Sequence, residues 1–164
     1  MTTPNLLAAP RQLAAWALVG YTGLYLLVVF LRWVVPTDFT TFGTRSAVTS
    51  TQFTALVELA LPLLAVLLAT AISPALPQAK LIAMVAVIEY AVILLLGVIT
   101  FLIGLGAADF DPRDGVATLA YVLLGLGRIV LAVIAGLVAY QAWNRAGGSL
   151  ASLTRPRTPA PPAA

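Results

Sequence analysis

Residues 81–105 read LIAMVAVIEYAVILLLGVITFLIGL, and this stretch decides the fold class. It contains one charged side chain, Glu89, and it is longer than the roughly 20 residues that a helix needs to cross a hydrocarbon core. It is too long for a strand, and in lipid each backbone polar group must be hydrogen-bonded within its own segment. The stretch therefore predicts a transmembrane α-helix.

Three further apolar segments of the same kind occupy residues 13–35, 53–72 and 116–143. Of the 164 residues, 61% are hydrophobic and 9% are charged, whereas a soluble domain is about 45–50% apolar and about 25% charged. We therefore expect an all-α, polytopic membrane protein, a four-transmembrane-helix bundle over residues 13–143.

The residue types that are missing exclude several kinds of chemistry. The chain contains no cysteine and no histidine, which removes disulfides, cysteine nucleophiles, iron–sulfur clusters, the usual zinc sites and His-ligated haem. No phosphate-binding loop, hydrolase motif or kinase motif occurs. The nine basic residues are scattered, so the net charge of +3 does not indicate nucleic-acid binding. We expect no enzyme activity, no cofactor and no metal.

The charges between the segments predict an orientation in the inner (cell) membrane. Arg11, Lys80 and the arginines of the C-terminal tail fall on one side with no acidic residue, whereas the other side mixes both signs. The positive-inside rule then places both termini in the cytoplasm. We expect residues 1–12 to form a cytoplasmic tail and the Pro-rich residues 144–164 to be disordered. The Ser/Thr-rich residues 37–54 are expected as an outer loop, with a short interfacial segment as an alternative.

Three ionisable side chains fall inside the predicted spans: Glu58, Glu89 and Arg128. Each needs a partner, since a charge near the bilayer centre costs about 2.5–3.5 kcal/mol. Counting about 1.5 Å per residue places Glu58 roughly 6–8 Å and Arg128 roughly 10 Å below the outer boundary. We therefore expect an ion pair, either a structural clamp or a substrate or ion site. Pro62 is expected to kink the helix and to free the Glu58 carbonyl for Arg128.

Glu89 is left without a cation by that pairing. It lies roughly 13 Å above the inner boundary, counted from Lys80. Tyr21 and Tyr25 on the first helix lie at a similar depth and share a face, so their hydroxyls are expected to hydrogen-bond Glu89. This group is a candidate proton or ligand site, with a purely structural link between two helices as one alternative and a Glu89–Arg128 pair as another.

A family resemblance centres on the second helix and its turn, residues 61–80, ending in Pro77-Gln78-Ala79-Lys80. The segment and the four-helix plan resemble small actinobacterial membrane proteins of the antigenic-protein type, which have proline-rich cytoplasmic tails. The resemblance implies a non-enzymatic envelope protein linked to cell-wall growth or division, and it assigns no role to a single residue.

Two functions are consistent with these observations. The first is a non-catalytic integral membrane protein that contacts the lipid bilayer and acts through a membrane-protein partner or as a homo-oligomer, since no catalytic constellation occurs and the expected disordered tail is short. Small residues that recur at helical spacing fit either packing within the bundle or a homo-oligomer interface. The alternative is a small proton-coupled transporter or channel subunit that uses Glu89, Glu58 and Arg128.

Overall fold

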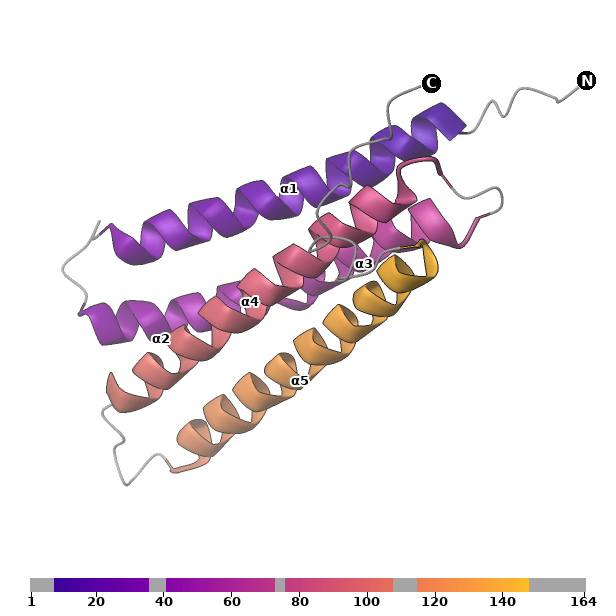
Figure 1. Ribbon diagram of the computed structural model, residues 1–164. Coiled ribbons are helices and arrows are strands. Elements are labelled where there is room, and N and C mark those ends of the chain that lie inside the picture. The colour runs from indigo at the N-terminus through magenta and orange to yellow at the C-terminus, as the bar shows by residue number, and fades with distance from the viewer. Residues whose placement is uncertain (1–7, 36–40, 73–75, 108–114, 148–164) are drawn as a thin grey trace, which may run out of the picture.

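The computed structural model describes residues 8–35, 41–72, 76–107 and 115–147, and this part of the chain is folded into helices. The helices lie lengthwise beside one another, and α2 and α3 follow each other end to end (Figure 1). In chain order they are α1 (Ala8–Val34), α2 (Phe42–Phe53), α3 (Leu56–Thr70), α4 (Ala79–Ala107) and α5 (Gly115–Arg145).

Four helical stretches are long and apolar enough to cross a membrane: Ala9–Val34, Phe42–Thr70, Ala79–Gly106 and Gly115–Arg145. The prediction of an all-α fold with four such stretches is therefore confirmed. The structure starts α1 at Ala8, so residues 8–12 of the expected tail are helical. Pro10 fits there because a helix tolerates proline in its first turn. Residues 1–7 and 148–164 of the predicted tails lie outside the described residues.

The second stretch differs from the prediction because the Ser/Thr-rich segment after residue 41 is helical, not a loop. Its hydroxyls bond back to carbonyls one turn earlier, as Ser46 does to Phe42 at 2.8 Å and Thr51 to Val48 at 2.7 Å. Such local bonds satisfy the hydroxyls within the helix. The polar composition of α2 is therefore compatible with a place beside the apolar α4.

The helical backbone is interrupted between α2 and α3. Thr54 ends α2 with φ −107° and ψ 22°, and Ala55 is extended, with φ −63° and ψ 140°. The Thr54 hydroxyl donates to the Ser50 carbonyl at 2.8 Å, which ties down the end of α2. Pro62 lies inside α3, so the structure breaks the helical run at Ala55 rather than at the proline.

The core lies between α1, α3 and α4, and α5 covers it from one side. Buried side chains of α3 and α4, among them Val66, Tyr90 and Ile93, form the main cluster together with Ala132 and Trp143 of α5. In the most apolar part of α5, 11% of the residues are buried, compared with 28–44% in the corresponding parts of the other three membrane-length stretches. The fifth helix is thus peripheral, and most of its circumference is exposed.

Polar contacts fasten α1 near both of its ends. The Arg11 guanidinium donates to the carbonyls of Leu68 and Ile72, at 2.9 and 2.8 Å, where α3 has carbonyls without partners inside the helix. The Trp33 indole donates to the Ser46 hydroxyl at 2.9 Å. These contacts hold α1 along the full length of the broken α2–α3 stretch.

Candidate functional site

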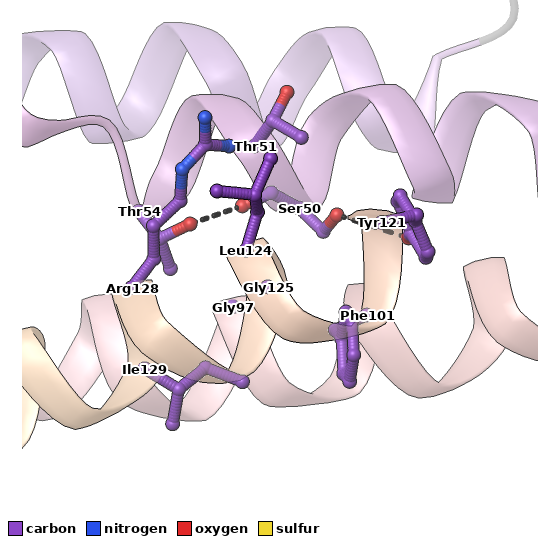
Figure 2. A pocket seen from close by; sticks show the side chains of 10 residues that line it. All are labelled: Ser50, Thr51, Thr54, Gly97, Phe101, Tyr121, Leu124, Gly125, Arg128 and Ile129. Carbon is purple, nitrogen blue, oxygen red and sulfur yellow. Dashed lines mark hydrogen bonds between the residues drawn. The ribbon is translucent and has the colours of Figure 1, made fainter. Parts of the chain in front are cut away.

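A small groove lined by apolar side chains, hydroxyls and one arginine lies where α2, α4 and α5 meet (Figure 2). Its cavity volume is about 130 Å³. Buried Gly97 and Phe101 of α4 form its floor. The walls come from α2 and α5: Ser50, Thr51, Thr54, Tyr121, Leu124, Gly125, Arg128 and Ile129. We call this hollow the Arg128 groove, after its one charged residue.

Glycines allow the three helices to approach closely enough to form the groove. A Cβ placed on Gly97 would lie 2.9 Å from Cγ2 of Thr54, and one on Gly125 would lie 2.3 Å from Cε2 of Phe101. The Phe101 and Tyr121 rings stack with centroids 5.6 Å apart, and the Tyr121 hydroxyl is within 3.3 Å of that of Ser50. Close backbone approach through small residues is typical of helix packing in lipid.

Arg128 is the one charged group of the groove, and Figure 2 shows its side chain directed from α5 toward α2. Among the described residues its guanidinium makes no hydrogen bond and no ion pair. Thr51 and Leu124, which also line the groove, are exposed. The Arg128 groove therefore opens on the outside of the bundle, between α2 and α5.

The structure does not bring Glu58 to Arg128. Glu58 is 6% exposed, and its Oε2 has no hydrogen-bond partner in the part of the chain that the structure describes. It lies near Tyr25 of α1. Depth counting placed Glu58 close to the outer boundary because the span was expected to begin at residue 53, whereas the helical stretch begins at Phe42. Glu58 consequently lies near the middle of its stretch and in the core.

A tyrosine of α4 bonds the carbonyl next to the Glu58 carbonyl that Pro62 frees. Pro62 is buried inside the helix, and the Tyr90 hydroxyl of α4 donates to the Leu59 carbonyl one turn before it. The tyrosine, rather than Arg128, thus supplies the external donor to this turn of α3. The same bond fastens this turn of α3 to α4.

Glu89 faces α1, the helix that was expected to receive it, but at a different residue. It is 6% exposed, and a Cβ placed on Gly23 would lie 3.4 Å from its Oε1. Its Oε2 has no hydrogen-bond partner among the described residues. Tyr21 and Tyr25 stack on each other with centroids 6.5 Å apart, and within the described ranges neither hydroxyl bonds Glu89. Arg128 does not reach it either.

The hydroxyl residues of the groove were not predicted as site residues. Ser50 and Thr54 are one helical turn apart on α2 and both are buried, so a polar stripe at helical spacing was the available signal. Comparison with models of protein families, with curated proteins and with solved structures finds no match for this chain. A function is therefore argued from the geometry of the groove and of the two buried acids.

Proposed function

We propose that this chain is a non-catalytic, multi-pass protein of the bacterial cell membrane that acts by lateral assembly with another membrane protein. Both termini lie in the cytoplasm in this proposal, as the distribution of basic residues favours. Its role in the envelope is in cell-wall growth or division, as the family resemblance implies.

The observation that carries the proposal is the peripheral position of α5. Exposed apolar side chains extend along the helix, from Leu119 and Leu126 to Leu137, while the buried positions are confined to Ala132, Ala139 and Trp143. Lipid contact alone requires only apolar residues on such a surface, yet α5 also carries Gly127, beside which no neighbouring atom lies within 4 Å. Small residues on an open helix face, next to a polar group, favour packing by a second helix.

Photo-crosslinking in the native membrane tests the proposal. A photoreactive amino acid at Leu131 or Leu137, both exposed on α5, should form one discrete protein adduct, identical for the two positions. The same group at Leu24 or Leu27, exposed on α1, serves as the control and should label lipid. Lipid adducts alone from α5, or protein adducts that form equally from α1, would contradict lateral assembly through this helix.

A second candidate function, a proton-coupled carrier or channel subunit, is favoured by the two buried acids. Glu58 and Glu89 each leave a buried carboxylate oxygen without a partner in the described part of the chain. Natural proteins rarely leave such groups unsatisfied, and a charged carboxylate in the membrane interior requires a cation or a proton.

Proton flux into liposomes separates the two functions. A carrier that uses the buried acids should lose most of its flux in Glu89→Gln and keep it in Tyr21→Phe, because Tyr21 is 55% exposed and bonds neither acid in the described structure. Proton flux no greater than in protein-free liposomes would exclude the carrier or channel function and leave lateral assembly as the proposed function.

A further inference from the structure

The position of Arg128 along α5 places its guanidinium, which has no acceptor among the described residues, inside the predicted membrane span. The helix has 31 residues, which corresponds to about 46 Å at 1.5 Å per residue. Arg128 lies roughly 20 Å from Gly115 at the start and roughly 26 Å from Arg145 at the end. A hydrocarbon core about 30 Å thick includes Arg128 wherever it is placed along this helix. A guanidinium at that depth is costly unless an acceptor approaches it.

The Arg128 groove offers one charged donor group and room for one small acidic group. The hydroxyls of Thr51 and Thr54 already donate to the carbonyls of Val48 and Ser50. The guanidinium is therefore the group that can bind an acid, and a guanidinium binds a carboxylate through two parallel hydrogen bonds. Its volume of about 130 Å³ is below the roughly 300–1,000 Å³ of small-molecule sites. The groove therefore suits the end of a side chain rather than a whole metabolite.

The direction of its opening favours an occupant that is itself embedded in the membrane. The floor is closed by buried Gly97 and Phe101, whereas the rim residues Thr51 and Leu124 are exposed on the outside of the bundle. An occupant therefore approaches from the side, between α2 and α5, as a neighbouring transmembrane helix does.

We propose that the Arg128 groove receives an aspartate or glutamate side chain from a transmembrane helix of a different protein. This inference rests on the proposed lateral assembly and names the chemistry of the partner. The described helices of a second copy do not supply the acid, because Glu58 and Glu89, the acids within them, are each 6% exposed. Because a charged side chain within the membrane needs a partner of opposite charge, we expect the acid to come from a helix of a different protein.

A binding assay with synthetic helices tests this pairing directly. The probes are a Leu/Ala transmembrane helix with one central aspartate and its twin with asparagine, each carrying a fluorescent donor. The full chain, labelled with an acceptor at Asn144→Cys, is reconstituted in phosphatidylcholine vesicles; the chain has no other cysteine. Energy transfer should show that the aspartate helix binds about tenfold more tightly than its twin.

Three variants assign the preference to the groove. Arg128→Gln should bind the two probes equally, whereas Arg128→Lys should retain part of the preference because it keeps the charge. Arg32→Gln removes an exposed arginine in the last turn of α1 and should bind as the wild type does. Equal binding of both probes by the wild type, or a preference that survives Arg128→Gln, would overturn the inference.

The failure of this inference is distinguishable from failure of the proposed function. If the α5 protein adduct in native membranes persists in Arg128→Gln, lateral assembly stands and the acidic partner is wrong. If α5 yields only lipid adducts, or adducts to a second copy of the chain, the heterologous pairing is overturned. An adduct that disappears in Arg128→Gln and returns in Arg128→Lys supports it.

Discussion

Replacing Gly104 by alanine is expected to push α2 away from α4. A Cβ on Gly104 would lie 2.8 Å from Cα of Ala47 and 2.7 Å from the Tyr121 hydroxyl. Carbon atoms in ordinary contact are about 3.5–4.0 Å apart, and the Ala47 contact is with backbone, which cannot rotate away. The helices must therefore separate, and the Tyr121–Ser50 contact at 3.3 Å opens with them.

The size of the effect follows from two opposing contributions. Forcing a methyl group into a packed contact costs about 1–3 kcal/mol. Alanine in a helix interior is more favourable than glycine by roughly 0.5–1 kcal/mol. The free energy of unfolding should therefore fall in Gly104→Ala, by up to about 2.5 kcal/mol.

Equilibrium unfolding by SDS in mixed micelles, followed by circular dichroism, measures this difference. Gly106→Ala is the matched control, because it lies on the same helix and a Cβ there meets no atom within 4 Å. The control should be unchanged or slightly more stable. Equal shifts in the two variants would refute the close approach of α2 to α4 at this position.

Three other experiments test contacts elsewhere in the bundle. Arg128→Leu should leave the free energy of unfolding unchanged or raise it. Its effect should add to that of Glu58→Gln within about 0.5 kcal/mol, since no ion pair joins the two residues in the described structure. A larger coupling energy in the double-mutant cycle would mean that Glu58 and Arg128 do form an ion pair. Arg11→Gln should lower the free energy of unfolding by about 1–2 kcal/mol in the same titration, because the guanidinium donates to two carbonyls at the end of α3, and no loss would mean that these bonds are not made. Trp33→Phe and Ser46→Ala should be non-additive by at least about 0.5 kcal/mol, as expected for bonded neighbours, and strict additivity would contradict the contact.

The fold was predictable where composition alone decides it. The stretch 81–105 leaves no alternative to an apolar helix, and α4 spans Ala79–Ala107. The segment Phe42–Phe53 was missed because its serines and threonines have the composition of a loop. Their hydroxyls donate to backbone carbonyls of the same helix, as that of Ser46 does. These hydrogen bonds form only in the helical conformation, so a hydropathy profile cannot predict them.

The missed start of the second stretch also explains the misplaced site. Counting depth from residue 53 moved Glu58 outward to the level of Arg128, whereas Glu58 lies near the middle of the stretch Phe42–Thr70. The groove itself depends on close approach of three helices through Gly97 and Gly125. Which glycine meets which neighbour is a tertiary property, so small residues in the sequence indicated close packing but not its location.

The Arg128 groove faces lipid only if α2 lies within the membrane as the first half of a broken span. The chain has no cysteine, so single cysteines can be placed at Val48 and Thr51, which are exposed on α2, and at Lys80, exposed near the start of α4, as a control. A membrane-impermeant maleimide, applied in turn to each face of intact vesicles, should label Lys80→Cys from one face. Val48→Cys and Thr51→Cys should react only after SDS is added. Labelling of either α2 position in intact vesicles at the rate of Lys80→Cys would contradict a membrane-embedded α2 and, with it, a groove that opens to lipid.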